Sequence, residues 1–257
     1  MSIDNIMIRT MQSGKTAIGL AASMPASAQV PMLASKAGFD WAFIDLEHTL
    51  ISPQDVDLLA NMLRVLDVTP LARIPNAALF DIARLLDSGV QGIIRPHVET
   101  AEQARQLVDM CKYAPVGARS WGGASPQLGH PQKPTRQLMD EANRTTLAIV
   151  MIESANGIEN IDAIANVPGL DGILVGCIDL SVDLDVIGEP KAPAMVEALE
   201  KIGRAVNSAG LYFGLGGIPS PEVLLDHPGL TVDFVLAGMD CRILASALED
   251  RMDLWRR

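Results

Sequence analysis

The sequence predicts one α/β domain, a single (β/α)8 barrel that spans residues 1–257. Eight short apolar runs alternate with amphipathic stretches along the whole chain, which is the pattern of a closed parallel barrel. The inner runs, such as Ala148–Ile152, are apolar without alternation, as strands covered on both faces are. The alternative is an open, doubly wound sheet. A Gly-x-Gly-x-x-Gly motif after the first run would favour that sheet, but Gly19 is the one glycine between residues 16 and 24.

The predicted strands follow from β-branched or apolar runs bounded by turn residues. In chain order they are Thr16–Ala22, Trp41–Leu46, Pro70–Ile74, Gly92–Val98, Thr146–Glu153, Gly172–Gly176, Tyr212–Ile218 and Asp233–Met239.

Helices are predicted between these strands. Leu79–Leu86 places apolar residues three and four positions apart, and Ala194–Val206 is a second, longer helix. Thr100, with Gln103 three residues later, has the spacing of a capping box that opens another helix. Three glycines that follow helical runs are predicted to end them: Gly38, Gly89 and Gly210.

The longest stretch without a clear strand or long helix is Tyr113–Thr145, which is rich in glycine and proline. Long loops inside compact domains often have a function. We therefore expect this segment to cover the top face of the barrel, where the strands end, as a lid.

Composition excludes several classes of function. A net charge of −11 with 4% aromatic residues and no basic stripe argues against nucleic-acid binding. No apolar run reaches the roughly 18 residues of a membrane span, and residues 1–15 do not form a secretory signal. The three cysteines, Cys111, Cys177 and Cys241, are widely separated, which argues against a disulfide framework or a CxxC zinc site. We expect a cytoplasmic protein that has no membrane partner.

Polar residues at the carboxyl ends of the strands carry the functional prediction, because barrel active sites form there. Glu153 and Asp179 end neighbouring predicted strands. Two carboxylates, completed by waters and a chelating substrate, suit Mg²⁺, which Mn²⁺ or Co²⁺ could replace. The alternative is that Glu153 caps the next helix and Asp179 caps a short turn.

A second cluster follows the second strand, where Asp45, Glu47 and His48 lie close together. A histidine beside a carboxylate suits a general base, although a solvated turn is the alternative. Arg73, at the end of the next strand, is predicted to hold an anionic substrate oxygen or to pair with Asp45. His97, at the end of the fourth strand, is a weaker candidate.

Two further features are weak candidates. The glycines at 214, 216 and 217 could present N–H groups to an anion, although tight barrel corners also need glycine. The cysteines are predicted to be buried and inert; Cys177, beside the predicted metal site, is the exception that could react.

These residues, taken together, resemble the HpcH/HpaI aldolases, the class II pyruvate-dependent family that includes 2-dehydro-3-deoxyglucarate and 4-hydroxy-2-oxoheptanedioate aldolases. The similarity extends from about Gly19 to Leu248. The segments that carry it are Ala37–His48, Ala72–Pro75, Leu85–Pro96, Pro115–Arg119, Ile152–Glu153, Pro168–Gly172 and Asp179–Ser181.

The resemblance implies roles for individual residues. Glu153 and Asp179 match the family's metal ligands, and Gly176, Cys177, Ile178 and Asp179 match its substrate-binding turn. His48 matches the active-site histidine, with Asp45 as its carboxylate partner. Arg73 matches the arginine on the substrate keto oxygen, and Asp87 matches an aspartate lent to the neighbouring subunit's site. A barrel whose last helix is swapped between subunits, within a hexamer or trimer of dimers, is also implied.

The implied reaction is metal-dependent cleavage or formation of 4-hydroxy-2-oxo acids through a pyruvate-type enolate. This route needs no lysine for a Schiff base, and consistently none of the candidate strand ends presents one. Two departures from the family pattern change the pocket: Met151 stands where the family commonly has Gln, and Cys177-Ile178 where it has Pro-Ala. They leave open an enolate-condensing synthase, either citrate-synthase-like or decarboxylating. A non-catalytic oligomeric binding protein is the third hypothesis, and the complete set of carboxylates, His48 and Arg73 argues against it.

Overall fold

The computed structural model describes residues 4–24, 27–75, 79–123, 125–130, 132–218, 220–222 and 229–256. Its strands form one closed parallel barrel in sequence order, with β8 paired to β1. The predicted barrel is confirmed, and each predicted strand is present. They are β1 (Ala17–Ala22), β2 (Trp41–Asp45), β3 (Thr69–Arg73), β4 (Gly92–Arg95), β5 (Leu147–Ile152), β6 (Gly172–Gly176), β7 (Tyr212–Gly216) and β8 (Phe234–Met239).

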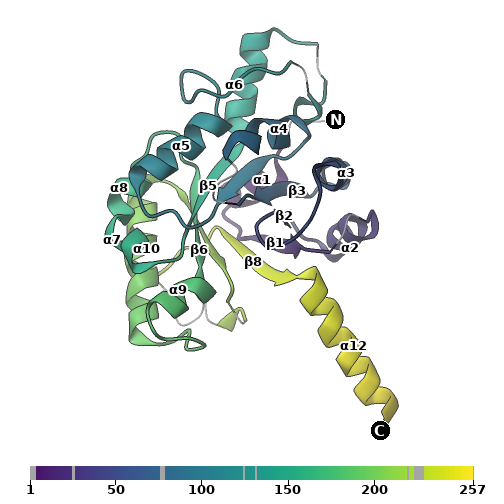
Figure 1. The fold of residues 1–257 in the computed structure, drawn as a ribbon, viewed down its shortest axis with the longest axis vertical. Coiled ribbons are helices and arrows are strands. Elements are labelled where there is room, and N and C mark those ends of the chain that lie inside the picture. Colours follow the sequence, from purple (N-terminus) through teal and green to yellow (C-terminus); the bar gives the residue numbers. More distant parts are fainter. Residues whose placement is uncertain are drawn as a thin grey trace.

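Helices surround this barrel (Figure 1). Thr100 and Gln103 form the predicted capping box of α5, and Gly38 and Gly210 end α2 and α10 in the left-handed conformation. The α-helices are α1 (Ile6–Gln12), α2 (Gln29–Ala37), α3 (Pro53–Val65), α4 (Ile82–Asp87), α5 (Ala101–Cys111), α6 (Thr135–Thr145), α7 (Ala155–Glu159), α8 (Ile161–Ala165), α9 (Cys177–Asp183), α10 (Pro193–Ala209) and α12 (Asp240–Arg256). The described residues also form two 3₁₀ turns, η1 (Leu79–Asp81) and η2 (Pro126–Leu128).

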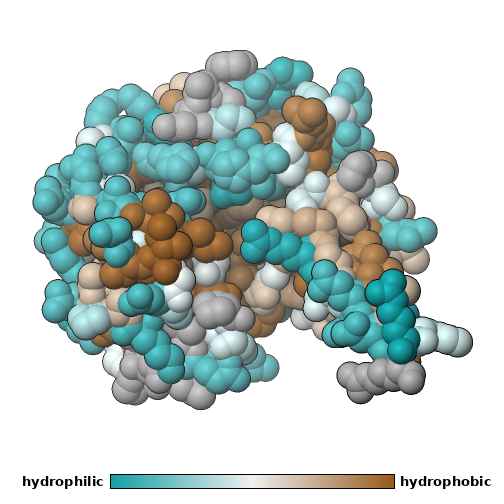
Figure 2. All heavy atoms as spheres, turned by 60° about the horizontal axis from the view of Figure 1, so that its bottom comes forward, coloured by the Kyte–Doolittle hydropathy of each residue, from teal (hydrophilic) through white to brown (hydrophobic). Residues whose placement is uncertain are grey.

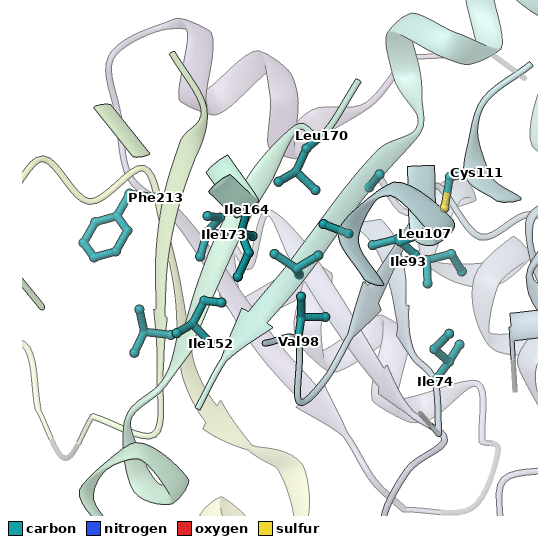
Figure 3. Close-up of a cluster of buried hydrophobic side chains, with 14 of the residues drawn as sticks. Ile74, Ile93, Val98, Leu107, Cys111, Ile152, Ile164, Leu170, Ile173 and Phe213 are labelled. Carbon is teal, nitrogen blue, oxygen red and sulfur yellow. The ribbon is translucent and has the colours of Figure 1, made fainter. Parts of the chain in front are cut away.

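Two apolar layers hold the barrel together. The larger lies between the sheet and the helices and includes Ile93, Leu107 and Ile173 (Figure 3). The second fills the barrel itself, where Trp41 packs edge-on against Phe234. Gly19 makes room for that indole, because a Cβ there would lie 2.1 Å from the ring. A packed interior leaves only the rim of the barrel for chemistry.

The predicted lid is wrong. The described residues 112–123, 125–130 and 132–134 lie between α5 and α6, and α6 ends just before β5, so they lie at the amino-terminal end of the barrel. Hydrogen bonds hold it there: Gln127 Nε2 donates to Thr146 Oγ1 at 2.9 Å, and Arg64 donates to the carbonyls of Pro126 and Gln127. A connection from a helix to the next strand lies at the end of the barrel where the strands begin, opposite their carboxyl ends. The described part of this segment therefore lies near the amino-terminal ends of the strands and not over the mouth.

The last helix, α12, leaves the end of β8 and extends away from the barrel (Figure 1). Its exposed apolar side chains are Ile243, Leu244, Leu248, Met252, Leu254 and Trp255. No helix in the described part of the chain is long and apolar enough to cross a membrane.

Candidate active site

The carboxyl ends of the strands bring the predicted polar residues to one rim. Asp45 and Arg73 are the last residues of β2 and β3, and the parallel register places them opposite each other. Glu153 directly follows β5, and Asp179 lies in the first turn of α9 after β6. The sheet closure thus gathers groups that lie far apart in the sequence.

Asp45 and Arg73 form a buried, two-bonded ion pair. Nε of Arg73 donates to Oδ1 of Asp45 at 3.0 Å, and Nη2 donates to Oδ2 at 2.9 Å. The guanidinium also lies 4.8 Å above the ring of Phe43. Such a fork-to-carboxylate pair has a fixed geometry. Nη1 is the nitrogen that these bonds do not use.

Asp45 was predicted to orient the imidazole of His48, and the described contacts give it a different partner. Both oxygens of Asp45 bind Arg73, while Oδ1 also accepts the backbone N–H groups of Glu47 and His48 at 3.1 and 3.4 Å. The imidazole of His48 is 63% exposed, and its Nε2 lies 3.8 Å from Oε2 of Glu47. Asp45 therefore orders the turn that carries His48 and binds Arg73, instead of holding the His48 ring.

Glu47 links this turn to the rest of the rim. One of its oxygens, Oε2, lies 3.3 Å from Nε of Arg73, but it is buried and has no hydrogen-bond partner. Its other oxygen, Oε1, lies 3.2 Å from Nε2 of His97. His97, the weaker candidate from the sequence, therefore lies inside the cluster.

Glu153 is a second buried carboxylate of this rim, beside Asp45. Its Oε2 accepts the backbone N–H of His97 at 2.9 Å, and Nδ1 of the same residue lies 3.3 Å away. Burial raises the pKa of Glu153, and the charges of Asp179 and Glu47 raise it further, whereas the contacts with His97 oppose the rise. On the other side, a Cβ on Gly176 would lie 2.4 Å from Oε1, so only glycine leaves room for this carboxylate. Ser154, not Glu153, caps α7, so the capping alternative is wrong.

The rim offers carboxylate oxygens, the ligands that a hard divalent cation prefers, but they do not form a closed set of ligands. Among the described residues, no group of three or more His, Cys, Asp or Glu side chains is arranged to surround a metal ion. Glu153 and the exposed Asp179 contribute two carboxylates from neighbouring strand ends, and Glu47 has an unpartnered buried oxygen nearby. Mg²⁺ is commonly bound by one or two carboxylates, with water and substrate completing the octahedron. The residues present are compatible with that arrangement.

The turn after β6 forms one wall of the rim. Cys177 is buried, and burial raises the pKa of its thiol to about 12, so this thiol is inert. Ile178 is half exposed and packs over Gly217, where a Cβ would lie 2.8 Å from its Cγ1. Gly214 lacks a side chain for a packing reason, because a Cβ would meet the ring of Phe234 at 2.2 Å. This wall is apolar next to Asp179.

Asp87 is the one predicted site residue that the structure keeps away from the others. It is the last residue of α4, at the end of the barrel opposite the carboxyl ends of the strands. Its Oδ1 accepts a hydrogen bond from Nη2 of Arg119 at 2.6 Å. The side chain of Arg119 is fully buried and lies 4.7 Å above the ring of Tyr113. Within one chain, Asp87 therefore cannot reach the rim.

Comparison with known proteins gives the family. The family model for HpcH/HpaI aldolase/citrate lyase matches residues 22–216. The chain belongs to this family. It is therefore an enzyme of the lyase type, and family membership argues against a non-catalytic binding protein.

Individual members of the family are similar over nearly their full length. A 4-hydroxy-4-methyl-2-oxoglutarate aldolase from Chaetomium globosum is 37% identical over 253 residues, which cover 97% of this chain and 94% of that protein. A solved HpcH/HpaI aldolase from Desulfitobacterium hafniense superimposes with a TM-score of 0.92 at 25% identity, covering 99% of this chain and 98% of that one. The citrate synthase SbnG superimposes with a TM-score of 0.88 at 25% identity, covering 98% of both chains.

Sequence reasoning ranked two residues of this HpcH/HpaI family member too low. Glu47 was named only as a neighbour of His48, and His97 was a weak candidate, yet both contact the central cluster. Both positions lie beyond the last residue of a strand, where the loop conformation decides the direction of the side chain. The φ angle of His97, 53°, is a tertiary property that its sequence neighbours do not reveal.

Proposed function

We propose that the protein is a divalent-metal-dependent aldolase that cleaves or forms 4-hydroxy-2-oxo acids through a pyruvate-type enolate. The observation that carries the proposal is the meeting of Arg73, Glu153 and Glu47 at the barrel rim beside Asp179. Similarity to a 4-hydroxy-4-methyl-2-oxoglutarate aldolase supports this substrate class. Cleavage of that compound between C3 and C4 would release two molecules of pyruvate.

Arg73 would stabilise the enolate oxygen. Asp45 fixes the guanidinium through Nε and Nη2, so Nη1 is the nitrogen that can meet a substrate oxygen. The side chain is largely buried, and a charged donor in a water-poor site contributes more than one in bulk water. Since Asp45 already holds the guanidinium in place, little reorganisation is needed when negative charge develops on the substrate oxygen.

Glu153 and Asp179 would hold the cation, which could be Mg²⁺, Mn²⁺ or Co²⁺. When bound, such a cation acts as a Lewis acid toward the carboxylate and keto oxygens of a 2-oxo acid. The turn Gly176–Asp179 would lie against the substrate, with Ile178 as an apolar wall.

His48 would take the proton from the 4-hydroxyl group. In that step the O–H electrons form the new carbonyl, the C3–C4 bond breaks, and its electrons pass to the enolate. The imidazole is exposed and can reach a substrate directly or through a water. Glu47 is the second candidate for the base, because its buried Oε2 has no hydrogen-bond partner.

An enolate-condensing synthase is the second candidate function. The similarity to citrate synthase SbnG and the apolar side chains of Met151 and Ile178 favour it. Such an enzyme would use the same enolate with another electrophile. It would leave 4-hydroxy-2-oxo acids uncleaved.

We further propose that the protein works as a cytoplasmic homo-oligomer, a hexamer or a trimer of dimers, in which α12 packs on a neighbouring barrel. The exposed apolar residues of α12 and its direction away from the barrel support this arrangement (Figure 1). Figure 2 shows apolar side chains on the projecting helix α12 and on the barrel surface across the hollow from it. Asp87, one-third exposed and held by Arg119, would then serve the neighbour's site next to His48.

The experiment is a panel of 4-hydroxy-2-oxo acids, with and without EDTA, coupled to pyruvate detection. We expect metal-dependent pyruvate release, lost in Asp179→Asn. Asp185→Asn is the matched control, because Asp185 is an exposed aspartate just after the same helix. Consumption of a 2-oxo acid without cleavage of any panel member would favour the synthase instead.

A further inference from the structure

The backbone of His97 has a conformation that its place in the fold does not explain. Four non-glycine residues of the described chain have positive φ angles. Asp67, Asp185 and His130 follow helical turns, where such angles commonly end a helix. His97, with φ 53°, instead follows Pro96 at the end of strand β4. A left-handed backbone is unfavourable for a residue with a Cβ, and it persists where surrounding contacts impose it, often at functional sites.

The contacts of His97 show what this conformation achieves. It directs the backbone N–H at Oε2 of Glu153, 2.9 Å away. The imidazole of the same residue lies between two carboxylates, with Nδ1 3.3 Å from Glu153 and Nε2 3.2 Å from Glu47. Half of the ring remains exposed at the barrel mouth. A single residue just after β4 therefore contacts the carboxylates that follow β2 and β5.

The loop that carries His97 is itself fixed. Glu99 accepts hydrogen bonds from Ser154 Oγ at 2.7 Å and from Asn156 Nδ2 at 3.0 Å, and these bonds lower the pKa of Glu99. Strand β5 adds a further bond, because the carbonyl of Met151 accepts the backbone N–H of Val98 at 3.1 Å. The loop after β4 is thus tied to the residues on both sides of Glu153.

We propose that His97 is a positioning residue that fixes the Glu153 carboxylate in the orientation needed to bind the divalent cation. The inference rests on the proposed metal site. The backbone N–H holds Oε2, the imidazole fills the space between Glu153 and Glu47, and Gly176 leaves room for Oε1. Groups that orient a metal ligand commonly change metal affinity by about 10–100-fold when they are removed.

Two substitutions separate the ring from the backbone. His97→Gly removes the imidazole and keeps the N–H, because glycine adopts positive φ without strain. His97→Val removes the ring and also disfavours the left-handed backbone, because valine is β-branched. Mn²⁺ is titrated into the metal-stripped full-length protein, and free Mn²⁺ is followed by its electron paramagnetic resonance signal. We expect the dissociation constant to rise about tenfold in His97→Gly and further, toward about 100-fold, in His97→Val.

The matched controls are His130→Gly and His130→Val. His130 has a φ of 51° but lies in the connection at the opposite end of the barrel. We expect these controls to bind Mn²⁺ as the wild type does, whatever their thermal stability. Wild-type Mn²⁺ affinity in both folded His97 variants would overturn the inference. Absence of Mn²⁺ binding by the wild-type protein would instead refute the proposed metal site, so the two failures are distinguishable.

A catalytic measurement completes the test. Because His97 would act through Glu153, saturating Mn²⁺ should restore much of the pyruvate-release rate of His97→Gly. A rate that stays low at saturating Mn²⁺ would show that the residue acts on substrate directly, and would also overturn a positioning role.

Discussion

Replacing Arg73 with methionine separates the two roles of the buried ion pair. Arg73 binds Asp45 through two hydrogen bonds of 3.0 and 2.9 Å, and both side chains are buried. Removing the cation leaves the Asp45 carboxylate buried and unpaired, which costs about 3–5 kcal/mol of stability. Loss of a charged donor to the developing enolate should also lower kcat by roughly 10²–10³-fold, or about 3–4 kcal/mol.

A second substitution distinguishes these costs. Asp45→Asn in the Arg73→Met background removes the uncompensated charge, so the double variant should recover part of the lost stability. It should not recover kcat, because no donor for the substrate oxygen returns. Urea unfolding measures the first quantity, and steady-state pyruvate release from a 4-hydroxy-2-oxo acid measures the second.

The control is Arg84→Met. Arg84 pairs with Asp81 at 2.8 Å on the surface, where its side chain is 73% exposed. Surface pairs of this kind contribute about 0–1 kcal/mol, so both stability and kcat should stay near the wild-type values. A wild-type kcat in folded Arg73→Met would refute the assignment of Arg73 to the enolate oxygen.

Four further outcomes are expected. Gly176→Ala places a Cβ 2.4 Å from Oε1 of Glu153 and should weaken Mn²⁺ binding at least tenfold, whereas Gly216→Ala, whose nearest neighbours lie at 3.7 Å, should not. Calorimetry of both variants checks this. His48→Ala should slow cleavage by roughly 10²–10⁴-fold and leave Mn²⁺ affinity unchanged; a wild-type cleavage rate would transfer the base role elsewhere. Burial raises the pKa of Glu153, so its ionised form destabilises the metal-free fold above that pKa. Glu153→Gln should therefore unfold at higher urea than the wild type near neutral pH in EDTA, and the gain should vanish as pH falls to the ordinary carboxyl pKa; a gain independent of pH would contradict this cause. Leu248→Glu, on the exposed apolar face of α12, should shift sedimentation toward smaller species, and an unchanged profile would argue against packing of α12 on a partner.

The elements of the barrel could be predicted because each has a local cause. Apolar runs such as Ala148–Ile152 can be buried on both faces only in a covered parallel strand, and β5 forms there. Thr100 and Gln103 satisfy the first turn of α5 with their own side chains, as their spacing indicated. The placement of Glu153 and Asp179 after neighbouring strands could also be predicted, because adjacent parallel strands end at the same rim.

The location of residues 113–130 could not be predicted once α6 was missed. Helix α6 is mostly polar and buries only Leu138 and Ala142, so its sequence does not stand out as an apolar stretch. The direction of the chain decides the matter: α5 runs back from the mouth, and β5 starts at the bottom. A segment between them must lie at the amino-terminal end.

The sequence by itself determined the eightfold alternation of strands and helices, and with it the rim that carries Asp45, Arg73, Glu153 and Asp179. Only the tertiary structure decided which of its two predicted partners, Arg73 or His48, Asp45 binds. The parallel register places Asp45 opposite Arg73. Asp45 therefore binds this arginine and not the imidazole of His48, which is closer in the sequence. Burial patterns depend on side-chain chemistry and chain order, which are written in the sequence. Pairing within a site depends on strand register and on loop dihedral angles, which are set only when the barrel closes.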